Sequence, residues 1–301
     1  MGVWGVGLYS GDFAMDLRSA IKAVARLPFD GERLVEILSE TAPAVADNPS
    51  DEDHTSFWLV VADQFAKRGI ISDRARTEAL QIIDADSDLA MCAALGMKPS
   101  DLSKRGKMLQ GLRARLTAPP VSKPRSVLKK PQAFLMDVGD VVGYPTCGGK
   151  CINPYFVSKE LDRATIPTGW KQDGWSAFVV VDRGRAFDFL SWYRPLTLTT
   201  AIAQKPTLAE LRGDVLWKLG RAGTCSPIHF KRMELERIGT LPIDADKLRH
   251  LLPAMRPGTP EAIDDVSIAN GLNVDPPNAA VRWRKPDPTI LGIDQVLRVG
   301  D

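Results

Sequence analysis

The sequence predicts an α+β protein, with a helical N-terminal bundle followed by a small antiparallel β-containing domain and its peripheral helices. Three observations support this fold class. Apolar residues recur at helical spacing up to residue 117, whereas alternating β-branched and aromatic runs begin only after residue 133. Between them, residues 118–132 hold four prolines and no apolar period. Because 301 residues exceed one typical domain, we expect two, 1–117 and 133–301, joined by a basic, Pro-rich linker over 118–132.

Five apolar stripes predict five helices in the first domain. They are carried by Leu17, Ile21 and Val24; by Leu34, Ile37 and Leu38; by Phe57, Trp58, Val61, Ala62 and Phe65; by Ala75, Ala79, Ile82 and Ile83; and by Leu109, Leu112 and Leu116. The third stripe is the broadest, as expected of the most buried helix in a bundle. Asp84, Asp86 and Asp88 alternate like part of a calcium loop, but Leu89 stands where that loop needs glycine. We therefore expect a helix end and its turn there.

The second domain is predicted to alternate strands with short helices. The expected elements are strands at 138–144 and 230–238, a hairpin of 176–182 and 187–193 closed by the loop 183–186, a helix after Pro206-Thr207, and a helix from Thr259-Pro260 to Gly271. From Asn273 onward the chain is rich in proline, and we expect this tail to run over the surface.

Composition and charge exclude several classes of protein. The formal net charge of +2 is too near zero to indicate a nucleic-acid binder by itself. The fully apolar runs are short, such as the six residues of 57–62, whereas a membrane-spanning helix needs about 20. The first residues have neither the basic start nor the apolar stretch of a secretory signal. We therefore expect a cytoplasmic protein with reduced cysteines and no membrane partner.

Aromatic residues point to the second domain as a recognition surface. Five of the seven tryptophans lie beyond residue 165, and Trp, Tyr and Arg are enriched at binding hot spots. Trp170 and Trp175 flank a short polar segment, and Arg183 and Arg194 follow in the predicted hairpin. We predict that one of the two tryptophans is partly exposed beside one of the two arginines and binds a protein partner. The alternative is that both rings cover the sheet as part of the core.

A basic segment offers a second kind of site. Nine Lys or Arg and no acidic residue lie between positions 104 and 130. Such a segment could contact the phosphate backbone of a nucleic acid, and the alternative is a solvated helix face followed by a linker. The candidate nucleic-acid residues are Lys104, Arg105, Lys107, Lys123, Arg125, Lys129 and Lys130.

Four residues could bind a metal. Cys147 and Cys151 form one pair at x3 spacing, and Cys225 and His229 form another; thiolate and imidazole groups are the usual ligands of tetrahedral zinc. The alternative is that the four are unconnected loop or core residues. Zinc is the one cofactor that the sequence suggests. Cys225 and His229 are also compatible with an enzyme whose active site is unrecognised, although the sequence assigns no catalytic residue.

Two segments resemble known bacterial proteins. The start MGVWGVGLYSGD, with Asp16 after it, is similar to an uncharacterised bacterial family that begins M-G-x-W-G-x-G and continues as a helical bundle; Phe57-Trp58 and Ala62-x-Gln64 resemble its next recognisable stretch. The run GDVVGY, ending at Tyr144, is similar to the first strand of a domain found among immunity proteins of toxin systems. The resemblance implies a bacterial cytoplasmic protein that binds or neutralises a partner.

The leading hypothesis is therefore a non-catalytic protein-binding module, of the immunity type found in bacterial toxin or defence systems. A nucleic-acid-associated protein that uses residues 104–130 is the first alternative. An enzyme with an unrecognised site near Cys225 and His229 is the second.

Overall fold

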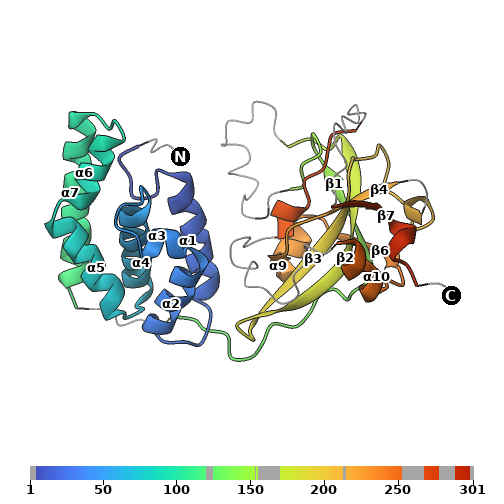
Figure 1. The fold of residues 1–301 in the computed structure, drawn as a ribbon, viewed down its shortest axis with the longest axis horizontal. Helices are drawn as coiled ribbons and strands as arrows, with labels where there is room; N and C mark the ends of the chain where they lie inside the picture. The colour runs from blue at the N-terminus through green and yellow to red at the C-terminus, as the bar shows by residue number, and fades with distance from the viewer. Residues whose placement is uncertain are drawn as a thin grey trace. The chain divides into compact units, whose positions relative to one another are not determined.

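The computed structural model describes residues 5–119, 125–152, 154, 170–212, 215–252, 268–277 and 289–298. The chain divides into two compact units, 1–130 and 131–301, and its fold is α+β (Figure 1). The boundary falls inside the predicted linker, and part of that linker packs on the helical unit. Leu128 donates its backbone N–H to the Arg26 carbonyl at 2.8 Å, and Arg125 donates to the carbonyls of Ala25 and Phe29.

The described part of the first unit is helical and holds no strand, as predicted. Its helices are α1 (Asp12–Val24), α2 (Gly31–Thr41), α3 (Pro43–Ala46), α4 (His54–Arg68), α5 (Asp73–Asp84), α6 (Ser87–Ala94) and α7 (Pro99–Thr117). The five apolar stripes correspond to α1, α2, α4, α5 and α7. The stripe of α4 is the most buried of them, with Phe57 and Val61 fully enclosed, and α4 packs against α1, α5 and α7.

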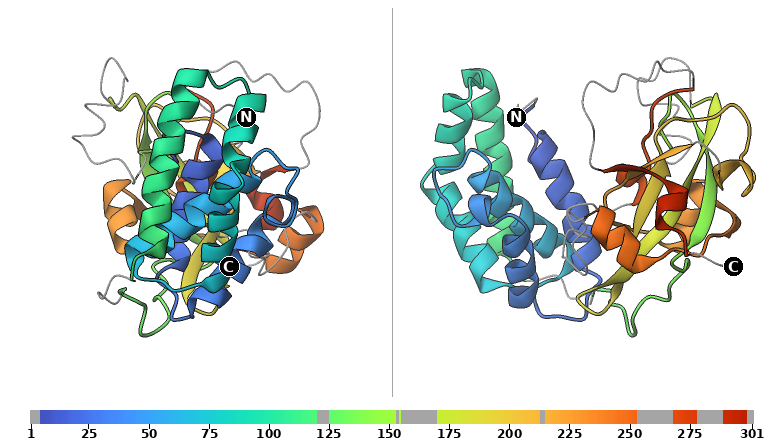
Figure 2. Two further views of the ribbon diagram at one scale, coloured as in Figure 1. Left: turned by 90° about the vertical axis from the view of Figure 1, so that its left-hand side faces the viewer. Right: turned by 45° about the vertical axis from the view of Figure 1, so that its right-hand side comes forward.

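The second unit contains a seven-stranded antiparallel sheet. Its strands are β1 (Asp140–Thr146), β2 (Gly174–Ala186), β3 (Leu190–Leu198), β4 (Leu216–Leu219), β5 (Gly223–Thr224), β6 (Glu236–Thr240) and β7 (Ile290–Gly292), in the order β6-β1-β2-β3-β4-β7 with β5 paired to β3. In Figure 2 the long β2–β3 hairpin is the yellow pair of strands.

Alternation along the strands buries both faces of this sheet. Val179 and Trp217 lie in one apolar cluster, whereas Phe178 and Tyr193 lie in the other. Short helices cover the faces. From α10 (Ala245–Leu251), Leu248 enters the first cluster, and residues of α9 (Pro227–Arg232) pack against the second.

The predicted turn of the β2–β3 hairpin, 183–186, is wrong: β2 continues to Ala186 and the turn falls at 187–189. Phe187 and Asp188 adopt the positive φ values of the turn, 50° and 62°. Gly184 stays in the strand because the Trp192 ring packs over it; a Cβ at position 184 would lie 2.6 Å from Cζ2 of that ring. A glycine that usually marks a turn here makes room for an aromatic side chain.

Three other predictions need correction. The predicted strand 230–238 begins as α9 and becomes β6 only at Glu236, because Ser226 caps a helix by accepting from the His229 N–H at 3.4 Å. Where a helix was predicted after Pro206-Thr207, the described residues before β4 form a 3-10 turn, Glu210–Arg212. The tail after Asn273 contributes β7 to the sheet edge. The helix expected from Thr259-Pro260 lies outside the described residues, apart from the 3-10 turn Ile268–Gly271.

Candidate functional site

The structure places Trp175 away from the two arginines that were predicted to lie beside it. Trp170 and Trp175 are half-buried, so the expected partial exposure is confirmed. Trp175 lies at the start of β2, where it pairs with Pro145, whereas Arg183 lies eight residues farther along the same strand. At about 3.3 Å per residue, that separation is about 25 Å. Arg194, across from the far end of β2, is only 5% exposed. The expected proximity is therefore wrong for Trp175.

Trp175 and Arg183 each contact other residues. Lys205 lies over the Trp175 ring, with its Nζ 5.7 Å from the centroid. Arg183 lies over the Phe134 ring at 4.3 Å and donates to the Met136 carbonyl at 2.9 Å. A guanidinium that stacks on a ring and holds a neighbouring segment has a structural role at this position.

In the described part of the basic segment, the cations do not form a continuous phosphate-binding surface. Arg105 is buried and donates to the Asp88 carboxylate at 2.6 and 2.9 Å. Lys104 pairs with Asp101 at 2.9 Å, and Arg125 is engaged with backbone carbonyls. Lys107, Lys129 and Lys130 are exposed, and Lys123 lies outside the described residues. The sequence could not show that Arg105 faces the interior of the bundle.

The predicted zinc ligands are not assembled. Within the described part of the chain, no three His, Cys, Asp or Glu side chains come close enough together to hold one ion. Cys151 and Cys225 lie in the apolar cluster that also contains Phe178. Burial raises the pKa of each of these two thiols to about 12. Both thiols are therefore protonated near neutral pH, which disfavours nucleophilic attack.

A recess of the helical unit, which we call the α4–α7 groove, has a volume of about 330 Å³. This is at the lower end of the range for ligand-binding sites. Its lining is mainly apolar and comes from the end of α4, the start of α5 and the end of α7: Ala62, Phe65, Ala66, Lys67, Gly69, Ile70, Ile71, Ser72, Asp73, Ala75, Arg76, Arg115, Leu116, Ala118 and Pro119.

Local sequence explains why the groove has an open apolar wall. Gly69 ends α4 in the left-handed conformation, with φ at 65°, and so reverses the chain. Ser72 then caps α5 by accepting from the Ala75 N–H at 3.1 Å. The two isoleucines between these residues differ in solvent exposure: Ile70 is buried, whereas Ile71 is 68% exposed. Ile71 is the most exposed of the large apolar side chains described.

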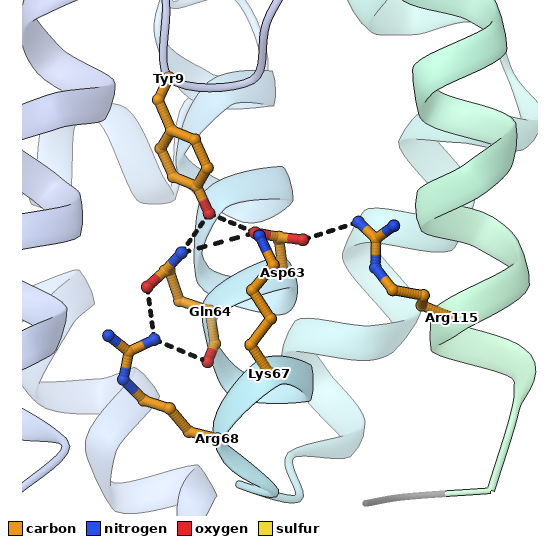
Figure 3. A network of polar contacts seen from close by, with 6 residues as sticks. All are labelled: Tyr9, Asp63, Gln64, Lys67, Arg68 and Arg115. Atoms are coloured by element: carbon orange, nitrogen blue, oxygen red, sulfur yellow. Dashed lines mark hydrogen bonds and ion pairs between the residues drawn. The ribbon is translucent and has the colours of Figure 1, made fainter.

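A polar network adjoins the groove (Figure 3). Asp63 of α4 is buried, and its carboxylate accepts from Lys67 Nζ at 2.6 Å and from Arg115 of α7 at 2.8 Å. Tyr9, from the segment before α1, donates its hydroxyl to the same carboxylate. Gln64 bridges the Tyr9 hydroxyl to Arg68. Lys67 and Arg115 belong to both the network and the groove wall.

Electrostatics fix the charge state of this network. Burial alone would raise the pKa of Asp63, but the hydrogen bonds from Lys67, Tyr9 and Arg115 outweigh burial and hold that pKa below its ordinary value. Asp63 is therefore an anion at neutral pH. The pKa of Tyr9 is raised, first by burial and then by its hydrogen bond to Asp63, so Tyr9 remains a neutral donor.

No local sequence pattern predicts this site. One signal was present: Asp63 and Gln64 interrupt the broadest apolar stripe, and a charged residue on a buried helix face needs partners. The identity of those partners depends on how α7 and the N-terminal segment pack on α4, which no local pattern records.

Comparisons of the chain with protein-family models, with curated proteins and with solved structures returned no match. Among the helices that the structure describes, none combines the length and the apolar character needed to cross a membrane.

Proposed function

We propose that this chain is a non-catalytic protein-binding module whose helical unit receives an apolar segment of a protein partner in the α4–α7 groove. The observation that carries the proposal is Ile71, which is 68% exposed on the wall of that groove. Exposed apolar area forgoes about 25 cal/mol per Å² of burial free energy. A recess rimmed by polar groups that leaves such area open is typical of an interaction site.

The charge of the rim favours an acidic partner segment. Lys67, Arg76 and Arg115 lie on the groove wall, where Asp73 is the one acidic residue among the described lining. Charge complementarity guides the encounter and disfavours partners of like charge. An apolar segment that carries carboxylates therefore suits this groove better than a basic one.

Two observations count against the alternatives. Arg105, at the centre of the basic segment, is held by Asp88 inside the helical unit, which removes it from a nucleic-acid surface. The Cys225 thiol, with its pKa raised to about 12 by burial, is a poor nucleophile at neutral pH. A role of the immunity type, in which binding neutralises a toxin, stays a prediction from the resemblance of the 138–144 segment.

The test begins by placing a photo-crosslinking amino acid at position 71, and at position 95 as the control. Leu95 is 45% exposed in the same helical unit but does not line the groove. A protein crosslinked from position 71 in the native host is then purified and titrated against wild-type, Ile71→Ser and Leu95→Ser chains.

Burying a whole Ile side chain contributes about 1.5–3 kcal/mol, and about two thirds of Ile71 is available. Ile71→Ser should therefore weaken binding by about five- to thirtyfold, since 1.4 kcal/mol is about a factor of ten, and Leu95→Ser should not. Equal binding by wild-type and Ile71→Ser chains would refute the groove as the interface.

A further inference from the structure

Lys67 and Arg115 are positioned by one shared anchor. Asp63, whose side chain is 1% exposed, holds both cations, while the Lys67 and Arg115 side chains are 50% and 49% exposed. Their charged ends are thus fixed by charge-assisted hydrogen bonds, and both residues line the α4–α7 groove. Two flexible side chains become a preorganised pair, which lowers the entropy cost of binding a ligand.

Both side chains keep donors for a ligand. An ammonium group has three N–H donors and a guanidinium group five. Asp63 accepts one contact from Lys67 and one from Arg115. The remaining donors on these half-exposed groups can turn to an anion in the groove without breaking the contacts to Asp63.

The net charge of the three residues determines which anion fits. Two cations and the Asp63 carboxylate leave one positive charge, which a monoanion balances. A phosphate dianion would place excess negative charge beside a buried carboxylate, which costs free energy in a medium of low dielectric constant. The adjoining wall, with exposed Ile71, Ala118 and Pro119, supplies apolar surface for the stem that carries the anion.

We infer that Lys67 and Arg115 form a carboxylate subsite at the edge of the α4–α7 groove, which binds a monoanionic carboxylate on an apolar stem. Resting on the proposed function, this inference names the feature of the partner that the helical unit recognises: an Asp or Glu side chain, or a terminal carboxylate, next to apolar residues. Recognition then combines burial of the stem with charge-assisted hydrogen bonds to the carboxylate.

Octanoate and 1-octanol are matched probes for this subsite, because they carry the same alkyl chain and differ in the carboxylate. Each is titrated into the full-length chain and followed by amide chemical shifts. We expect octanoate to bind about tenfold more tightly than octanol, the effect of one charge-assisted contact. Arg115→Gln and Lys67→Gln should each bring octanoate close to octanol. Arg113→Gln is the matched control, since Arg113 lies on α7 but pairs with Asp84 outside the groove.

A measurement on the wild-type chain tests the subsite even if the variants do not fold. Salt screens charges at a surface over about 10 Å at 0.1 M, so added salt should reduce the octanoate preference and leave octanol binding unchanged. Equal affinity for both probes would overturn the carboxylate subsite but would not contradict binding of an apolar segment in the groove. No binding of either probe would overturn the subsite, while crosslinking from position 71 would still decide the proposed function separately.

Discussion

Replacing Arg105 by methionine should strongly destabilise the helical unit. Arg105 and Asp88 are 3% and 1% exposed and share two hydrogen bonds, of 2.6 and 2.9 Å. Arg105 also donates to the Gly7 carbonyl at 3.2 Å and so holds the N-terminal segment on α7. Arg105→Met would leave the Asp88 carboxylate buried with one weak remaining donor, Thr55, at 3.3 Å.

The cost follows from the desolvation of that carboxylate. Removing one partner of a buried ion pair costs about 3–5 kcal/mol, and the lost contact to Gly7 adds to it. With a urea m-value of about 2 kcal/mol per M, the unfolding midpoint of the helical unit should fall by about 2 M. Replacing Asp88 by leucine as well should recover most of the loss, because a packed apolar pair of similar volume is often as stable as a buried ion pair.

Urea unfolding followed by circular dichroism at the helix band tests this in the full-length chain. Lys107→Met is the control, since Lys107 is exposed on the same helix and surface substitutions usually change stability by less than about 0.5 kcal/mol. A loss below about 1 kcal/mol for Arg105→Met would show that the Asp88 carboxylate is hydrated in solution, and the reasoning would fail.

Three other predictions follow from buried groups. The pKa values of the Cys151 and Cys225 thiols are raised to about 12 by burial, so both should resist alkylation at neutral pH until the chain unfolds. Half-exposed Cys147 should react first. Mass spectrometry of the labelled peptides would show the order of reaction, and equal rates for the three cysteines would contradict the prediction. Because the pKa of Asp63 is lowered in the folded chain, its contribution to stability is present above the ordinary aspartate value of 3.8 and is lost as pH falls through the folded-state pKa. Asp63→Asn should therefore flatten the fall in unfolding free energy on acidification, and an unchanged slope in urea titrations across that range would argue against the network. Tyr9→Phe removes one donor from the Asp63 carboxylate and should cost about 1–3 kcal/mol by the same titration, so a change within about 0.5 kcal/mol, as for a surface substitution, would be inconsistent with the contact.

Local periodicity was sufficient to predict the larger helices. The stripes of α1, α2, α5 and α7 each identify the face that is buried, whereas α4 is buried on all sides from Phe57 to Phe65. Periodicity failed for α3, which has four residues, and for α6, whose buried residues are only Asp88 and Cys92. Short helices that bury a polar residue leave no apolar period to detect.

Pairing in the sheet depends on contacts between distant residues, so its details escaped prediction. Gly184 carries the local signal of a turn, but its role is set by Trp192 on the opposite strand. The groove shows the same limit. Lys67 and Ile71 lie at the end of α4 and just after it, whereas Arg115 lies on α7, and only the packing of α7 on α4 brings Arg115 to them.

Burial separates two arginines that look alike in the sequence. Arg105 and Arg115 lie on the same helix, and each pairs with an aspartate that is 1% exposed. Arg105 is buried together with Asp88, and its charge stabilises that buried carboxylate. Removing Arg105 should therefore lower the free energy of unfolding by about 3–5 kcal/mol. Arg115 is 49% exposed, and Asp63 keeps Lys67 and Tyr9 as partners when Arg115 is replaced, so its loss should resemble that of a surface pair, about 0–1 kcal/mol. The two substitutions should therefore have different effects. Arg105→Met lowers the stability of the fold, whereas Arg115→Gln lowers carboxylate binding in a chain that stays folded.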